Sequence, residues 1–399
     1  MAKGKWLTLL ILCLLFTIIG SVSADDDPTT PYPVERRCVD APTFPPDDWT
    51  YPGTLLFSGY AGIHGMRAEW ETPHVLAAFS PHHQQVPLYG YQISPDQNWI
   101  AVPYGHREVE PSFNQAWYLQ SVHIASLSDS ATVTIDLTPY EAQLWPEMTW
   151  VYFPIQWLDN EQFVIAGLLI HPFENSIEEA PTDIRIYSAY VKWDLNISPD
   201  FTRAFHADYG DRLGLHDVVT EVSINDQLLR YSLTSGIAWR HDSSSFIGDI
   251  GLENAPHVLS IFSRDGDREE MVMELGEQEI NFERQGGGRN ESRWSPDDTR
   301  FAFTLNANAY SPQPLLIADT AHKIIWDTCL AAAGEPVWSP DGRMLAFLRV
   351  AGGRENFNVI VLDVTTEQAY QVARHIGGRY TASTSYQPEN AQMVGWQPD

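Results

Sequence analysis

The fold is decided by the segment Trp338-Ser339-Pro340-Asp341-Gly342-Arg343-Met344-Leu345-Ala346-Phe347. Proline at the second turn position presets φ, the aspartate can bond the backbone ahead of it, and the glycine takes positive φ without a Cβ clash. The apolar residues that follow suit a short strand packed on both faces. A second complete copy of this turn and strand is Trp294-Ser295-Pro296-Asp297-Asp298-Thr299-Arg300-Phe301-Ala302-Phe303.

Weaker copies of the motif recur along the chain and begin at Ile93, Trp157 and Trp239. The last copy, Trp396-Gln397-Pro398-Asp399, stops before its strand, whereas Thr54-Leu55-Leu56-Phe57-Ser58 is such a strand with no motif in front of it. The two ends therefore look like halves of one repeat. A ring of repeats closed by its own termini is typical of the β-propeller, an all-β fold.

The number of motif copies predicts the number of blades. Six copies, with the split copy counted once, predict a six-bladed ring. The longest interval contains Ile197-Ser198-Pro199-Asp200, which would begin a seventh blade. Residues 184–195 run on without a break, however, and leave no room for an outer strand before a new blade. We therefore interpret 196–201 as a hairpin turn and 208–235 as an insertion, with seven blades as the alternative.

The repeated segments resemble the Trp-Ser-Pro-Asp-Gly repeats of TolB-like β-propellers over nearly all of the chain after Thr54. The resemblance implies a propeller that holds a protein or peptide partner. It also implies that the motif residues build blades and that the ligand site lies elsewhere; they are Trp294, Pro296, Asp297, Trp338, Pro340, Asp341, Gly342 and Trp396. The Asp-box repeat of sialidases requires a Thr-Trp ending that no copy has.

Three segments are expected along the chain. Residues 1–24 combine a basic start, an apolar run from Trp6 to Ile19 and small residues at the end, the pattern of a signal peptide. The run is shorter than a membrane span requires, with an uncleaved anchor as the alternative. Residues 25–50, rich in Pro, Asp and Thr, predict an extended or disordered leader, and residues 51–399 the propeller. We expect an extracytoplasmic protein, secreted or periplasmic, with no integral membrane segment after cleavage.

Two cysteines lie outside the signal segment, Cys38 in the leader and Cys329 in the propeller. In an oxidising compartment they can form one disulfide, which would pin the leader across the fifth blade. Two unrelated thiols are the alternative.

The chain is strongly acidic, with a formal net charge of −28 that loss of Lys3 and Lys5 with the signal peptide makes more negative. Nucleic acid and anionic lipid surfaces repel such a chain. Solubility is the plain explanation of the charge. The functional explanation of the charge is a basic protein or peptide partner, which a monomeric propeller would bind.

Motifs of known catalytic chemistry are absent from the sequence. It has no Gly-x-Ser-x-Gly, no His-Glu-x-x-His, no Cys-x-x-Cys and no Gly-x-Gly-x-x-Gly. Imidazoles and carboxylates suited to a transition metal gather in one region, but in no known ligand spacing; they are His64, His74, His82, His83, His106, Glu69, Glu71, Glu108 and Glu110. We therefore predict no catalytic residues and no cofactor, with a divalent metal ion as the alternative. Asp265-Gly266-Asp267 is interpreted as a hairpin turn, with calcium as a minor alternative.

Aromatic residues crowd the region between the first two motifs, where packing between blades is the plain interpretation and ligand stacking the functional one; they are Trp117, Tyr118, Trp145, Trp150 and Tyr152. Two classes of function remain. The first is a binding or scaffolding propeller that uses one face or the mouth of its channel. The second is a hydrolase or lyase with a divalent metal at the ring axis.

Overall fold

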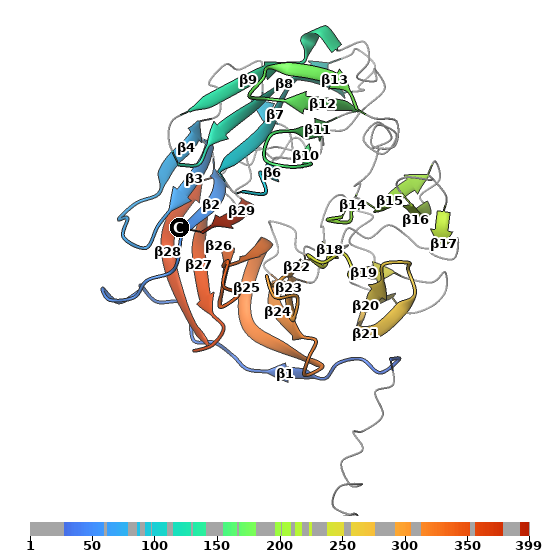
Figure 1. Ribbon diagram of the computed structural model, residues 1–399. Helices are drawn as coiled ribbons and strands as arrows, with labels where there is room; N and C mark the ends of the chain where they lie inside the picture. The colour runs from blue at the N-terminus through green and yellow to red at the C-terminus, as the bar shows by residue number, and fades with distance from the viewer. Residues whose placement is uncertain are drawn as a thin grey trace, which may run out of the picture.

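The structure of the chain, a computed structural model, describes residues 28–59, 62–78, 86–87, 92–96, 98–109, 115–128, 131–140, 155–165, 167–180, 196–200, 202–208, 212–217, 223–225, 238–250, 257–275, 292–304, 313–351, 356–377 and 392–398 (Figure 1). Nearly all of its regular structure is β-strand, with one short 3₁₀ turn, η1 (Thr138–Tyr140). Among the helices of the described chain, none has the length and apolarity to cross a membrane.

The strands form a series of antiparallel sheets that follow one another along the chain. The first sheet is β29-β2-β3-β4, with bounds Gln392–Gln397, Thr54–Gly59, Gly62–Met66 and His74–Ala78. The second contains β5 (Val86–Pro87), β6 (Gln92–Ile93), β7 (Trp99–Val109), β8 (Gln115–Ser126) and β9 (Thr132–Asp136). The third is β10 (Ile155–Trp157), β11 (Phe163–Ile165), β12 (Leu168–His171) and β13 (Ser176–Glu179).

The remaining sheets continue the series. The fourth is β14 (Asn196–Ile197), β15 (Arg203–Asp208), β16 (Arg212–Asp217) and β17 (Ser223–Asn225), and the fifth is β18 (Ala238–Trp239), β19 (Ser245–Ile250), β20 (His257–Ser263) and β21 (Arg268–Leu275). The sixth and seventh share one long strand, and comprise β22 (Ser292–Trp294), β23 (Arg300–Thr304), β24 (Gln313–Asp319), β25 (Ile324–Trp338), β26 (Met344–Val350), β27 (Asn356–Asp363) and β28 (Gln368–Gly377). The first part of β25 pairs with β24 and its end pairs with β26.

These sheets are the blades of a β-propeller, and the described residues form seven units of four or five strands, two of which share β25. The prediction of six blades is therefore wrong, and the described sheets correspond to the seven-blade alternative. The strands of the third blade are so short that all four fit between Ile155 and Glu179, ahead of the segment that seemed to leave no room. Residues 196–201 lead into a sheet of their own, and the supposed insertion supplies two of its strands, β16 and β17.

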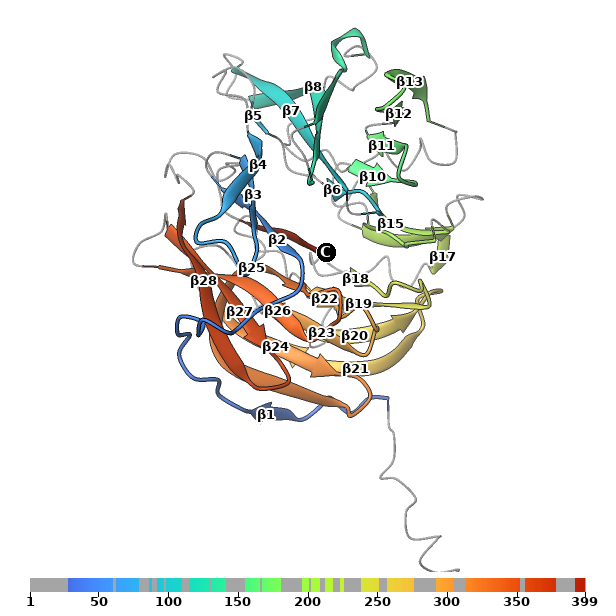
Figure 2. The ribbon, with the colours of Figure 1, turned by 60° about the vertical axis from the view of Figure 1, so that its left-hand side comes forward.

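The two chain ends pair within the first blade, as the split motif predicts. Strand β29 runs antiparallel to β2, so the end of the chain, marked C in Figure 2, lies beside β2. Leu55 is opposite Trp396 and Phe57 is opposite Met393. Both of these β29 side chains are buried, and they pack with residues of β26 and β27 in one apolar cluster. Other apolar clusters join the second blade to the first and third, and the sixth to the fifth and seventh. Burial between neighbouring blades therefore stabilises this part of the ring.

The leader is an extended strap along the outer strands of the last three blades. Strand β1 (Val34–Arg36) adds to β25 in parallel, so the leader extends the sixth blade by one strand (Figure 1). Before β1, Tyr32 donates its backbone N–H to the carbonyl of Val272 in the fifth blade; after it, Thr43 bridges β28 in the seventh. A Cys38–Cys329 disulfide fixes the middle of the strap to β25. The blade it crosses is the sixth, not the fifth, because of the additional fourth blade. Residues 1–27, including the predicted signal peptide, lie outside the described residues.

Closure of the ring depends on a glycine that precedes β2. Gly53 has a φ of +72°, and a Cβ added there would lie 2.0 Å from the carbonyl oxygen of Gln397. Gly342 has a similar φ of +68°, but its nearest neighbour would be a side-chain atom 3.4 Å away. We expect Gly342→Ala to cost about 1–2 kcal/mol in unfolding free energy from backbone strain alone. Gly53→Ala should cost clearly more, because it also forces β29 away from β2. Denaturant unfolding of the two variants measures the difference, and equal losses would contradict this role of Gly53.

Candidate functional site

Four turns of identical sequence, Ser-Pro-Asp, connect the first strand of a blade to its second. In each turn the serine hydroxyl donates to the aspartate two residues on, as from Ser295 Oγ to Asp297 Oδ1 at 2.6 Å. The same Ser295 oxygen accepts the backbone N–H of Arg300 at 3.0 Å and so closes the turn from inside. The equivalent pairs are Ser94–Asp96, Ser198–Asp200 and Ser339–Asp341. All four serines are buried and all four aspartates are exposed.

Neighbouring turns are hydrogen-bonded to one another across blades. The backbone N–H of Asp96 donates to Asn160 Oδ1 of the third blade at 2.8 Å, and that of Asp200 donates to Ser243 Oγ of the fifth at 2.9 Å. The backbone N–H of His241 donates in the same way to Asp298 Oδ1 of the sixth blade at 3.1 Å. These contacts join the turn of the second blade to that of the third, and the turn of the fifth blade to those of the fourth and sixth. We call the carboxylates that the turns carry the turn rim, namely Asp96, Asp159, Asp200, Asp242, Asp297 and Asp341.

The predicted motif residues are divided between the core and this rim. Trp294, Trp338 and Trp396 are buried, and Trp294 Nε1 donates to the carbonyl of Ala238 in the preceding blade at 3.0 Å. Gly342 has the positive φ expected of it, a conformation that Ser243 and Asp298 adopt in the same place of the two preceding turns. The other predicted members, Pro296, Pro340, Asp297 and Asp341, lie in the turns themselves.

Hydrogen bonds lower the pKa values of five of the rim carboxylates, namely Asp96, Asp159, Asp200, Asp242 and Asp297. Partial burial by itself would raise the pKa of Asp297, but donors from Ser295 and Thr299 lower it below its ordinary value. The pKa values of Asp96, Asp159 and Asp200 are lowered in the same way, against partial burial, by side-chain and backbone donors of their own turns. For Asp242 the hydrogen bonds from Ser244 are the largest cause of a lowered pKa. The rim therefore presents fixed negative charge at neutral pH.

These lowered pKa values predict a sensitivity to acid. A carboxylate with a folded-state pKa below its unfolded value stabilises the fold above that unfolded value, and the contribution is lost as pH falls through the folded pKa. We expect the unfolding free energy to stay level down to about pH 5 and to fall below about pH 4. Ser295→Ala should cost about 1–3 kcal/mol at pH 7, because the partly buried N–H of Arg300 loses its acceptor. It should also raise the pH at which acid unfolding begins. Circular dichroism against pH, with exposed Ser128→Ala as control, measures both effects. An acid transition that does not move in Ser295→Ala would contradict this account.

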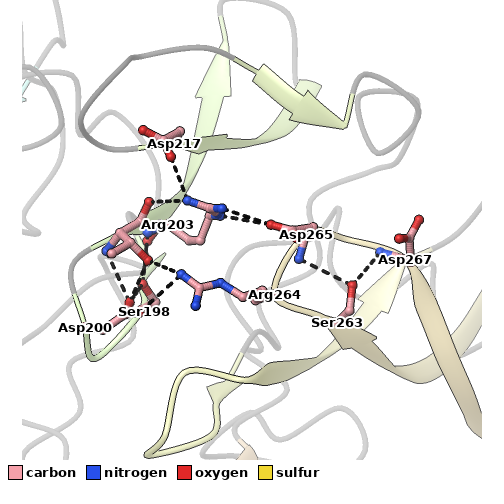
Figure 3. Close-up of polar contacts among 9 residues, drawn as sticks. Ser198, Asp200, Arg203, Asp217, Ser263, Arg264, Asp265 and Asp267 are labelled. Atoms are coloured by element: carbon pink, nitrogen blue, oxygen red, sulfur yellow. Dashed lines mark hydrogen bonds and ion pairs between the residues drawn. The ribbon is translucent and has the colours of Figure 1, made fainter.

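A network of ion pairs joins the fourth and fifth blades beside the rim (Figure 3). Arg203, at the start of β15, binds Asp217 of its own blade at 2.7 Å and Asp265 of the next blade at 3.0 Å. In the opposite direction, Arg264 of the fifth blade reaches Asp200 at 3.3 Å and Thr202 Oγ1 at 2.6 Å. Each blade thus supplies an arginine to the other blade's turn. Sequence reasoning missed this seam, although the Ser198-Pro199-Asp200 triplet was a sign that an ordinary blade begins there.

The predicted histidine and carboxylate group is not assembled into a site by the residues described. His64 is half-buried against Phe57, where burial lowers its pKa, and His74 stacks on Trp70 with ring centres 4.1 Å apart. Glu69 and Glu71 are exposed in the turn after β3, and His106 and Glu108 belong to β7. His82, His83 and Glu110 lie outside the described residues. Within the described part of the chain, no three His, Cys, Asp or Glu residues are grouped to hold a metal ion.

Two other predictions concern single segments. Asp265-Gly266-Asp267 forms the turn between β20 and β21, with Gly266 at a φ of +86°, so the hairpin interpretation is confirmed. Among the aromatic residues, Trp117 and Tyr118 belong to β8, whereas Trp145, Trp150 and Tyr152 lie outside the described residues.

Comparison with known proteins gives likeness of structure alone. No protein-family model matches the chain, and no curated protein matches it. TolB from Acinetobacter baumannii is 12% identical, with 86% of this chain and 67% of that chain covered at a TM-score of 0.42. An oligogalacturonate lyase in complex with manganese is 12% identical (85% and 89% covered, TM-score 0.48), and the tricorn protease is 10% identical (84% and 36% covered, TM-score 0.41). The assignment of the fold rests on the sheet topology.

Proposed function

We propose that this chain is an exported β-propeller that holds a basic protein or peptide against its turn rim. The observation that carries the proposal is the repetition of one exposed aspartate at the equivalent turn of six blades. Most of these carboxylates are kept ionised by donors of their own turns, and the hydrogen bonds also fix their positions. A rigid row of like charges complements a cationic segment at little cost in ordering the binding side.

The charge of the whole chain supports the same partner. A formal charge of −28 attracts cationic molecules at long range and repels nucleic acid and anionic membranes. Export is supported by the Cys38–Cys329 disulfide, since such bonds persist mainly in oxidising compartments. No observation on the described residues favours a catalytic site over a binding surface.

Charge-neutral variants of the rim test the proposal. Asn at positions 96, 159 and 297 keeps the Oδ1 acceptor of each turn and removes the charge. At positions 96 and 159 it also removes the Oδ2 acceptor of an amide side chain of the same turn. We expect the triple variant Asp96→Asn, Asp159→Asn, Asp297→Asn to bind an arginine-rich peptide at least several-fold more weakly than the unchanged protein, with a smaller dependence of affinity on salt. The matched control is Asp136→Asn, at the end of β9 away from the turns, which carries an exposed carboxylate with a lowered pKa.

Isothermal titration at two salt concentrations measures both quantities. The loss of peptide affinity is compared for each charge removed. If this loss is the same in the control and in the rim variant, only net charge matters and the rim is not the binding surface. Binding that is absent altogether, in a protein that carries a stoichiometric divalent ion and hydrolyses or cleaves a sugar substrate, would replace the binding function with the enzymatic alternative.

A further inference from the structure

The disulfide of the strap has a cationic side chain at one of its two sulfurs. Arg36, the last residue of β1, places its Nε 3.3 Å from Sγ of Cys329. Arg37, its neighbour, instead pairs with Glu35 and lies 3.8 Å from Glu367. The two adjacent arginines carry the same charge, but Arg36 contacts the sulfur whereas Arg37 contacts carboxylates.

The two sulfurs also differ in their access to solvent. Cys38 is exposed on the strap, whereas Cys329 is partly buried in β25. A thiolate in solution therefore reaches Cys38 more easily, which would make Cys329 the leaving group. A leaving thiol departs faster when its pKa is low, and a neighbouring arginine lowers the pKa of a cysteine thiol.

We propose that the Cys38–Cys329 bridge is a thiol-exchange site, at which a dithiol reductant attacks Cys38 and Arg36 stabilises the departing thiolate of Cys329. The attacking thiolate forms a bond to Cys38 Sγ, and the electron pair of the broken S–S bond leaves on Cys329 Sγ. The second thiol of the reductant then attacks the sulfur that the reductant contributed to the mixed disulfide, and Cys38 leaves as a thiolate. The dithiol is oxidised to a disulfide, and the bridge takes up its two electrons.

Reduction at this site acts on the strap and leaves the ring closed. The strap crosses β21, β25 and β28, whereas closure is made by β29 and β2, which lie in another blade. Near the bridge the strap is also held by backbone hydrogen bonds, from Arg37 to the carbonyl of Asp327 and from Val39 to that of Thr328. The indole of Trp326 donates to the carbonyl of Arg37, and the side chain of Val39 is buried. None of these contacts is covalent. The bridge is therefore the one covalent tie of the strap in the described chain.

The first test measures how fast dithiothreitol reduces the bridge in the folded protein at pH 7, by alkylation of released thiols and mass spectrometry. Arg36→Gln is compared with Arg37→Gln, which changes the net charge equally. The logarithm of the exchange rate changes with the pKa of the attacking thiol with a slope of roughly 0.4–0.5. If the slope for the leaving thiol has the same size, each unit by which the pKa of Cys329 rises slows reduction about threefold. We expect Arg36→Gln to be slowed about threefold or more and Arg37→Gln to match the unchanged protein. Equal rates in the two variants would overturn the proposal.

The second test reads the thiol of Cys329 directly. In Cys38→Ser protein, the rate of Cys329 alkylation by iodoacetamide is followed against pH. We expect an apparent pKa below the ordinary value of about 8.5, and a rise when Arg36→Gln is added. A merely structural role of Arg36 would not move this titration. An ordinary pKa in both proteins would contradict the proposal even if the reduction rates differed.

Discussion

A protein that lacks residues 393–399 is expected to lose several kcal/mol of stability and to melt at a clearly lower temperature. The deletion removes most of β29, with the strand pairing that joins the two chain ends. It also removes Trp396 and Met393, which are 5% and 3% exposed and lie in the cluster between the seventh and first blades. Loss of one large buried aromatic costs about 3–5 kcal/mol by itself, and the edge of β2 becomes unpaired as well.

The control for this truncation is removal of residues 398–399 alone, which leaves β29 and Trp396 in place. We expect its melting temperature to stay close to that of the full chain. Differential scanning calorimetry on both proteins makes the comparison. A seven-residue deletion that melts together with the control would mean that the ring does not depend on closure by its ends.

Removal of the Cys38–Cys329 disulfide is the second change with a large expected effect. The bridge joins residues 291 apart in sequence, and for so long a loop chain-entropy estimates exceed about 4 kcal/mol, less whatever structure the unfolded chain retains. The strap also contributes buried side chains, Tyr32 and Val39, to the clusters of the last three blades. We therefore expect Cys38→Ser, Cys329→Ser protein to unfold at a lower denaturant concentration than the oxidised chain.

The reduced, unsubstituted protein serves as the control, because it lacks the bridge but keeps both cysteine side chains. Both forms should lose about the same free energy of unfolding. Trypsin should also cleave after Arg36 or Arg37 faster in both, since the strap opens locally more often. Freely alkylated thiols in protein exported by its native route, with no loss of stability on substitution, would rule out a structural bridge.

Structural features that depend on residues close together in the sequence could be predicted. The Trp-Ser-Pro-Asp turn carries its own hydrogen-bond donors and acceptors, so its copies indicated the strands on either side and the meeting of β29 with β2. The fourth blade was set aside, although its copy at Ile197 was seen, because residues 184–195 left no evident room for an outer strand of the third blade. The last strand of the third blade in fact ends at Glu179. The first strand of the fourth blade has only two residues. Its serine nevertheless makes the same bonds as the others.

Contacts between residues far apart in sequence could not be predicted in the same way. Arg203 and Asp265 are 62 residues apart and meet only because the fourth and fifth blades are neighbours. The aspartates of the motif were recognised as turn residues, but their alignment along one rim follows from bonds between turns, such as that from Asp200 to Ser243. The disulfide was predictable because only two cysteines were available, whereas the arginine beside it was not.

The long strand β25 has a consequence for how this ring comes apart and how it can be rebuilt. In most repeat architectures each unit contacts its neighbours through side chains and can be exchanged or inserted as a module. Here a single 15-residue strand is the outer edge of the sixth blade and the inner edge of the seventh. The two blades therefore form one module, and amide exchange within them should report one opening event. Circular permutants that open the chain inside β25 should fail to assemble. The sixth and seventh blades can therefore be exchanged or inserted only as a pair.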